Sequence, residues 1–172
     1  MKTTKRKTNN IIYVLNLVAV ILFLLPAFKL NLFTENYSTL SLTTRGYLYL
    51  LFLGIFIGLI FGYETKYIQN SKYGFYMFLF MFIGVMIPHH VPYNLQGNLH
   101  LIFAYLGFAG ISIITILNCQ LKKYRDTYLM FLFIAILIYL KCGMVNTLSE
   151  VIVMLSSIYI NLTCYKKRRT MN

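Results

Sequence analysis

The sequence has few charged residues, and very few of these are acidic. Charged side chains make up 12% of the 172 residues, with four Asp or Glu against sixteen Lys or Arg. Because a soluble globular domain is usually about one quarter charged, this composition argues against such a domain. Tryptophan is absent, so the aromatic side chains that often collect at a membrane interface have to be Tyr and Phe.

Cysteine is scarce too. The chain has Cys119, Cys142 and Cys164, without a CxxC pair or the spacing of a metal site. The sequence therefore carries no redox or structural-metal motif, and we interpret the three cysteines as small apolar residues of helices.

Apolar residues are abundant, at 59% of the chain, and they gather in six runs. A helix of roughly 20 apolar residues crosses the roughly 30 Å of hydrocarbon in a bilayer, and continuous rather than alternating apolar runs indicate helices. The fold class predicted is all-α, a polytopic membrane bundle of six transmembrane helices in a single integral membrane domain over residues 1–172. The expected spans are Ile11–Phe33, Tyr47–Tyr63, Phe75–Tyr93, Leu99–Cys119, Tyr128–Gly143 and Val151–Tyr165. The fifth is short and is expected to recruit flanking residues such as Thr127.

The basic residues are distributed unevenly around these runs. Clusters precede the first run, separate the second from the third and the fourth from the fifth, and follow the sixth, whereas the opposite side has only Lys29, Arg45 and Lys141. Since loops rich in Lys and Arg stay in the cytoplasm, we expect a multi-pass cell-membrane protein with both termini cytoplasmic. The first run lacks a cleavage site and is interpreted as an uncleaved helix. The expected partners are membrane lipids and not nucleic acid, because no aromatic-basic platform is present.

A strip of small residues marks the second run. Gly54, Gly58 and Gly62 recur every fourth residue, so they lie on one helix face and allow another backbone to approach closely. We expect them to pack against a helix of the same chain. A homo-oligomer or a membrane protein partner on this face remains the alternative.

Ionisable and polar residues gather at one predicted depth, on the outer side. The candidate ligand-binding residues there are His89, His90 and Tyr93 at the end of the third run, His100, Glu150, Lys141 and Arg45. An ionisable group at the membrane usually faces the interior and finds a partner. We therefore expect Glu150 to pair with His100, Lys141 or Arg45.

Four interpretations of this outer cluster stay open. It is an ordinary hydrated interface, or a pocket for a lipid headgroup or small ligand. It is a catalytic site, with His100 as general base, Glu150 orienting it, and a nucleophile from the outer link. The hydroxyls available are Ser38, Thr39, Ser41, Thr43 and Thr44. Or the outer histidines bind zinc or haem, although their spacing matches no specific metal motif.

The order of motifs resembles that of the Frag/DRAM/Sfk type of six-helix membrane proteins and their uncharacterised bacterial relatives. The resemblance is carried by Gly97-Asn98-Leu99-His100, followed by Ala104 and Phe108, and by Ser149-Glu150. It implies a lipid-related role, since members are implicated in GPI-lipid remodelling, membrane lipid asymmetry or autophagy, and it carries over His100 and Glu150 as site positions. Leu40–Gly46 lacks the acidic residue of the family's first outer link, so the resemblance does not by itself imply an enzyme.

These observations lead to one expected function and two alternatives. We expect a small, lipid-associated membrane protein with an outward-facing polar pocket around His100 and Glu150. The first alternative is a membrane-embedded lipid-modifying hydrolase or transferase that uses the same two residues. The second is an accessory or immunity-type subunit of a membrane complex.

Overall fold

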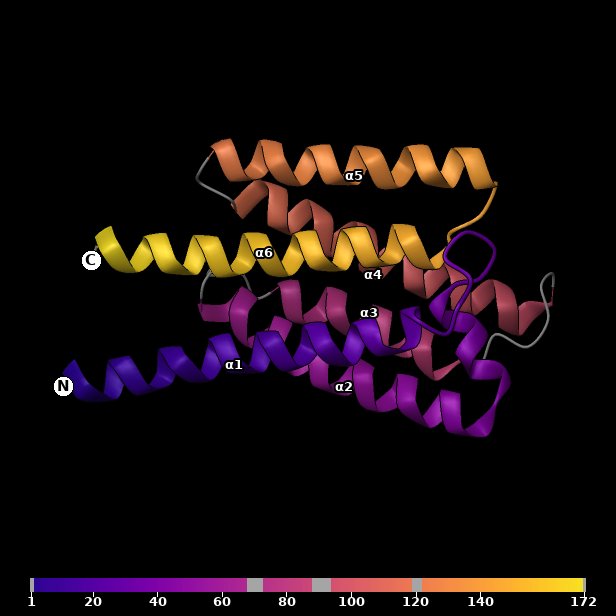
Figure 1. Cartoon of the computed structure of the whole chain (residues 1–172), viewed down its shortest axis with the longest axis horizontal. Coiled ribbons are helices and arrows are strands. Elements are labelled where there is room, and N and C mark those ends of the chain that lie inside the picture. The colour runs from indigo at the N-terminus through magenta and orange to yellow at the C-terminus, as the bar shows by residue number, and fades with distance from the viewer. Residues whose placement is uncertain (1, 68–72, 88–93, 119–121, 172) are drawn as a thin grey trace.

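A computed structural model describes residues 2–67, 73–87, 94–118 and 122–171, and every regular element in this part of the chain is a helix (Figure 1). The all-α class predicted from the apolar runs is therefore confirmed. The elements in chain order are α1 (Lys2–Ala27), the 3-10 helix η1 (Tyr37–Leu42), α2 (Thr44–Tyr67), α3 (Tyr73–Met86), α4 (Leu95–Asn118), α5 (Lys122–Cys142) and α6 (Thr147–Met171).

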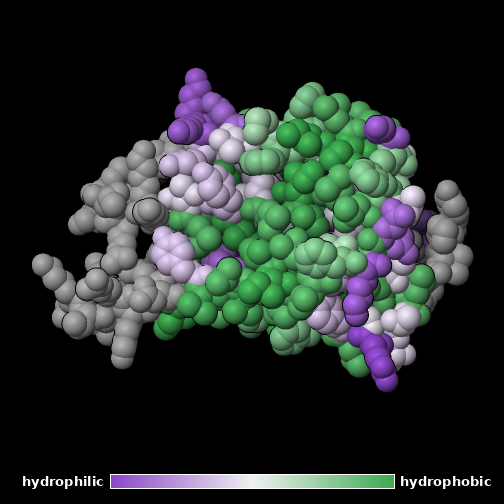
Figure 2. Space-filling view, viewed as in Figure 1, coloured by the Kyte–Doolittle hydropathy of each residue, from purple (hydrophilic) through white to green (hydrophobic). Residues whose placement is uncertain are grey.

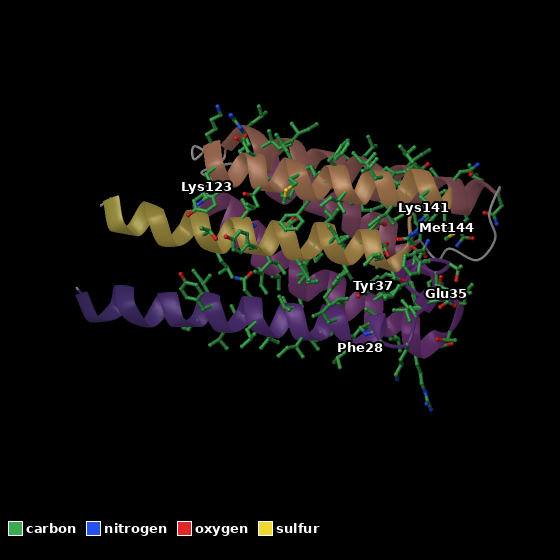
Figure 3. The ribbon with its side chains drawn as sticks, turned by 45° about the horizontal axis from the view of Figure 1, so that its top comes forward. Phe28, Glu35, Tyr37, Lys123, Lys141 and Met144 are labelled. Carbon is green, nitrogen blue, oxygen red and sulfur yellow. The ribbon has the colours of Figure 1, made fainter. Side chains whose placement is uncertain are left out.

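The α-helices lie side by side along the long axis of the molecule, and both termini are at the same end (Figure 1). Helix α3 packs against α4 and α2, α5 packs against α6, and α1 contacts α2 and α6. Tyr37, Glu35, Lys141 and Met144 lie at the end opposite the termini, whereas Lys123 lies at the end that carries them (Figure 3).

By length and composition, one helix in the described part of the chain is able to cross a membrane, at Leu95–Leu117. Three further apolar helical segments are shorter, at Ile11–Ala27, Thr44–Ile60 and Thr147–Thr163. The helices themselves extend beyond these apolar segments, because polar residues continue them at one or both ends.

Helix α1 ends at Ala27, so the expectation that it continues to Phe33 is wrong. Proline has no backbone N–H, so Pro26 leaves the carbonyl of Leu22 without its donor in the helix. The Tyr49 hydroxyl of α2 donates to that carbonyl instead. The Pro26 carbonyl then accepts the N–H groups of Lys29 and of the residue after it, at 2.8 and 3.1 Å, which closes the last turn.

Two other boundaries differ from the apolar runs. The first is at Asn94–Asn98, which was expected to link the third and fourth spans. In the structure Asn94 caps α4, and the four residues after it form the first turn of that helix. The Asn94 side-chain oxygen accepts the N–H of Gly97 at 2.6 Å, as in an N-cap. Helix α5 begins at Lys122 and includes Thr127, which supplies the flanking residues that its short apolar run requires.

The interior of the bundle holds polar as well as apolar side chains, and many large apolar side chains lie exposed on its outside. Tyr128 of α5 is 1% exposed, and its hydroxyl bonds to Ser112 of α4 at 3.1 Å and to Ser157 of α6 at 3.3 Å. The outward apolar residues include five that are 60–76% exposed, namely Leu17, Leu59, Leu117, Phe133 and Leu140. Hydrophobic residues cover the middle of the visible face, and hydrophilic ones gather toward its ends (Figure 2).

Among the α-helices described by the structure, the closest approach at a glycine is between α3 and α4. A Cβ on Gly84 would lie 2.9 Å from the backbone nitrogen of Ala104 and 3.3 Å from the carbonyl oxygen of His100. A Cβ on Gly54 would meet the Phe82 ring at 3.5 Å and Val85 Cγ1 at 3.9 Å, both ordinary contacts with side chains. At Gly54 the glycine strip of α2 thus faces a helix of the same chain. Gly58 is buried, and the surroundings of Gly62 lie outside the described residues.

The Tyr49 hydrogen bond can be tested by a double-mutant cycle. Tyr49→Phe should lower the free energy of unfolding by about 1–3 kcal/mol, because a buried carbonyl loses its donor. In a Pro26→Ala background the new N–H satisfies the Leu22 carbonyl, so the same change should cost less. Thermal unfolding in detergent measures both losses. Tyr159→Phe, at an exposed ring, is the control. Equal losses in the two backgrounds would show that Tyr49 does not replace the missing donor.

The α3–α4 crossing can be tested with a matched glycine pair. In Gly84→Ala the new methyl meets backbone that no rotamer change can move, so we expect a loss of about 1–3 kcal/mol in unfolding free energy. Gly54→Ala should be neutral or stabilising, because the contact is ordinary and alanine favours a helix by about 1 kcal/mol. Denaturant titration in the same detergent compares the two variants. Similar stabilities would contradict the close approach at Gly84.

Candidate functional site

The 3-10 helix η1 lies in the link between α1 and α2 that was expected on the outer side, and its own sequence defines both of its ends. The Asn36 side-chain oxygen accepts the N–H of Thr39 at 3.2 Å, and the Thr39 hydroxyl accepts the N–H of Asn36 at 3.4 Å, which is a capping box. After η1, a Cβ on Gly46 would lie 2.1 Å from the carbonyl oxygen of Leu40, so only glycine fits there. This local geometry holds Tyr37 and Ser38 at the start of η1 in fixed positions.

His100 connects η1 with the end of α3. Its Nδ1 lies 2.7 Å from the Gly84 carbonyl oxygen and 2.8 Å from that of Ile87, and its Nε2 lies 2.8 Å from Ser38 Oγ. Carbonyl oxygens only accept, so Nδ1 carries a proton. In a neutral imidazole Nε2 is then the acceptor, and the Ser38 hydroxyl donates to it. The side chain is 6% exposed, so this geometry is enclosed by protein.

Glu150 holds η1 from the side of α6. Its Oε2 accepts the backbone N–H of Tyr37 at 2.8 Å. The Tyr37 ring stacks on Phe23 with centroids 4.3 Å apart, and its hydroxyl donates to the Phe23 carbonyl. Burial, and then the nearby Glu150 carboxylate, raise the pKa of Tyr37 above its ordinary value, so the phenol stays protonated as a donor.

The start of α6 is fastened to the same outer link. The N–H and the hydroxyl of Thr147 both donate to the Glu35 carbonyl, at 2.7 and 2.8 Å. The N–H of Leu148 donates to the Leu32 carbonyl at 3.0 Å. Asn146 caps the helix, because its side-chain oxygen accepts the N–H of Ser149 at 3.0 Å. The link from α1 to η1 therefore satisfies the first donors of α6.

The predicted partners of Glu150 are wrong. We expected it to pair with His100, Lys141 or Arg45, and instead it accepts the Tyr37 N–H. The reason is that η1 places an unsatisfied backbone donor within reach of the carboxylate, and backbone carbonyls already hold the imidazole. Lys141 and Arg45 are exposed, and Lys141 lies at the same end of the molecule as Tyr37 (Figure 3).

The structure thus brings together only part of the predicted cluster. His100 and Glu150 contact consecutive residues of η1, Ser38 and Tyr37. The other candidates, His89, His90 and Tyr93, lie outside the described residues. Among the residues described, no three His, Cys, Asp or Glu side chains come close enough to hold a metal ion. Of the predicted histidine ligands for zinc or haem, His100 lies in the described part of the chain. Both of its ring nitrogens already make hydrogen bonds.

The sequence did not single out Ser38 or Gly84, two residues that bond to His100 in this site. Nothing distinguishes Ser38 from the four other hydroxyls of the outer link, and Gly84 carries no motif. Two capping signals were available, however: Asn36 followed three residues later by Thr39, and Asn146 followed by Ser149. They mark the start of η1 and of α6.

Comparison with known proteins gives no match: no protein-family model, no curated protein and no solved structure is significantly similar to this chain. The site has to be interpreted from its own geometry.

The contact between Glu150 and η1 can be tested by two substitutions. Glu150→Ala leaves the buried Tyr37 N–H without an acceptor, so peptides covering residues 35–43 should exchange their amide hydrogens faster. Glu150→Gln keeps an accepting oxygen and should preserve most of the protection. Hydrogen-exchange mass spectrometry in detergent makes the comparison. Unchanged protection in Glu150→Ala would mean that the carboxylate does not hold η1.

Proposed function

We propose that this chain is an integral membrane protein of six transmembrane helices, with both termini cytoplasmic, and that its outer end associates with lipid. The single observation that carries the proposal is the number of large apolar side chains that lie exposed. They cover the middle of the visible face of the bundle (Figure 2), while hydroxyl and amide side chains are buried together with apolar ones. In water such a surface would far exceed the apolar patch of an ordinary monomer, whereas in a bilayer acyl chains cover it.

Helix length supports the membrane assignment. Five of the α-helices have 21 to 26 residues. At about 1.5 Å per residue they measure roughly 30–40 Å, which is enough to cross about 30 Å of hydrocarbon with polar residues at their ends. Helix α3 has 14 residues and is correspondingly shorter. The excess of basic residues around the two termini supports a cytoplasmic location for that end.

The composition of the outer end supports contact with lipid headgroups. Apolar side chains before and within η1 lie exposed, with Phe28 at 85%, Phe33 at 56% and Leu42 at 58%. Lys141 is exposed at the same end of the molecule as Tyr37 (Figure 3), and Arg45 is exposed in the first turn of α2, close after η1 in the chain. Aromatic and apolar side chains next to cations suit the boundary between acyl chains and anionic headgroups. The resemblance to the Frag/DRAM/Sfk type agrees with a lipid-related role.

A lipid-modifying hydrolase or transferase is the second candidate, and the Ser38–His100 hydrogen bond favours it. The accessory-subunit alternative has less support, because Gly54 of the small-residue strip contacts α3 of the same chain.

Topology is tested by labelling in intact cells. In a background with Cys119, Cys142 and Cys164 changed to Ser, a membrane-impermeant maleimide should label Thr34→Cys from outside. Lys123→Cys should react only after the cells are permeabilised, because α5 begins at the cytoplasmic end (Figure 3). Labelling of both positions from the same side, or release of the protein by alkaline carbonate, would refute the six-span proposal.

The same preparations test the lipid part of the proposal. Native mass spectrometry after gentle detergent extraction should show bound anionic phospholipid. An Arg45→Gln, Lys141→Gln variant should retain less of it. A bare protein in both samples would count against headgroup binding while leaving the topology intact.

A further inference from the structure

We propose that Ser38 and His100 form a nucleophile and general base that transfer an acyl group from a lipid ester at the outer face of the membrane. The inference rests on the proposed membrane location and extends it from lipid contact to a covalent reaction. Ser38 Oγ and His100 Nε2 are 2.8 Å apart, within the range of an activated serine. His100 bridges α4 and α3 and meets η1, so the pair is assembled from three separate elements.

The orientation of the imidazole is what a general base requires. Its Nδ1–H is held by the carbonyls of Gly84 and Ile87 at 2.7 and 2.8 Å, which directs the Nε2 lone pair at the Ser38 hydroxyl. In serine hydrolases a third group performs this function, often a carboxylate. Here two backbone carbonyls at the end of α3 perform it. Since carbonyls at a helix C-terminus favour positive charge, they also stabilise the imidazolium that forms during the reaction.

Ser38 differs from other hydroxyls in what accepts its proton. Ser41 donates to the Ser38 carbonyl, Ser156 to Val153 and Thr163 to Tyr159. Those acceptors are amide oxygens, which do not take up a proton at neutral pH. The acceptor of the Ser38 proton is an imidazole, a base that can take up a proton and return it. Ser38 is therefore the hydroxyl in this set that is poised to become a nucleophile.

The position of Ser38 determines the class of substrate. The residue is half-buried in η1, in a stretch of chain that also carries the exposed apolar side chains of Phe33 and Leu42. In the proposed membrane location this is the depth at which the ester groups of glycerolipids lie, between headgroups and acyl chains. An ester carbonyl can approach from the bilayer without leaving it, with its acyl chain in contact with the apolar surface. The substrate class is an acyl ester of a membrane lipid.

The reaction balances with these two residues and an acyl acceptor. Ser38 Oγ forms a bond to the ester carbonyl carbon while its proton passes to His100 Nε2. The tetrahedral intermediate collapses, the bond to the lipid alcohol oxygen breaks, and the departing oxygen takes the proton from Nε2. Water, or the hydroxyl of a second lipid, then gives its proton to Nε2 and attacks the acyl-serine. Ser38 leaves with that proton, and the product is a fatty acid or a new ester.

A fluorophosphonate probe tests the pair directly, since it reacts with activated serines and releases fluoride. Applied to wild-type protein in vesicles of phosphatidylcholine and phosphatidylglycerol, it should modify Ser38, as identified by peptide mass spectrometry. His100→Gln should slow the reaction at least about 100-fold, because the general base is lost. Ser38→Ala should abolish it. Thr44→Ala, an exposed hydroxyl at the start of α2, is the matched control and should react like wild type.

A purely structural role for the hydrogen bond predicts a different result. Ser38 would then only fasten η1 to His100, and folded wild-type protein would not react at Ser38. That result overturns the inference even if Ser38→Ala and His100→Gln fail to fold, because it needs only the wild-type chain. It would leave the topology and lipid-retention results of the proposed function untouched. Conversely, labelling of Thr34→Cys and Lys123→Cys from the same side of the membrane would refute the six-span proposal, whatever the reactivity of Ser38.

Discussion

The structure depends on one constraint: each helix that ends in apolar surroundings leaves backbone groups that need hydrogen-bond partners. At the end of the molecule opposite the termini, the elements satisfy one another. The Leu22 carbonyl, released by a proline in α1, takes the hydroxyl of Tyr49, and the Phe23 carbonyl takes that of Tyr37. The first N–H of η1, that of Tyr37, is taken by Glu150 of α6. These bonds tie α1, α2, η1 and α6 together, and none of them is an ion pair.

The same constraint explains why His100 and Glu150 act separately. At the end of α3 the Gly84 carbonyl accepts the N–H of Ile87 at 3.2 Å, and the imidazole Nδ1–H lies within hydrogen-bond distance of both the Gly84 and the Ile87 carbonyls. The His100 imidazole thus has two backbone carbonyls as hydrogen-bond acceptors, and the Glu150 side chain accepts the backbone N–H of Tyr37 in η1. The close α3–α4 approach at Gly84 is what brings the imidazole within reach of these carbonyls. A buried ion pair would have had to offset the desolvation of two charges, whereas these bonds involve one carboxyl group and no cation.

The sequence predicted the helices well and their ends poorly. Continuous apolar runs locate helices because burial and helix formation act over many residues, and the all-α class follows from them. Ends are decided by single residues: Pro26 stops α1, and Asn94 starts α4 inside a segment expected to be a link. For the site, the sequence predicted only that His100 and Glu150 lie at a common depth in the bundle. The contacts of each were not predictable, because they depend on η1, a six-residue element with no periodic signal whose position is set by tertiary hydrogen bonds.

Several interactions besides the Ser38 hydrogen bond hold η1 in place, so η1 does not depend on that one bond for its position. Tyr37 is fixed by its ring stacking, by its hydroxyl and by its N–H to Glu150, while Asn36 caps the helix and donates from Nδ2 to the Val145 carbonyl at 3.3 Å. A neutral hydrogen bond contributes only about 0.5–1.5 kcal/mol net. In the proposed reaction, acylation of the Ser38 hydroxyl removes one such bond, while the others continue to hold the backbone. Because η1 is anchored independently of Ser38, loss of that bond leaves the contacts of η1 with α1 and α6 in place.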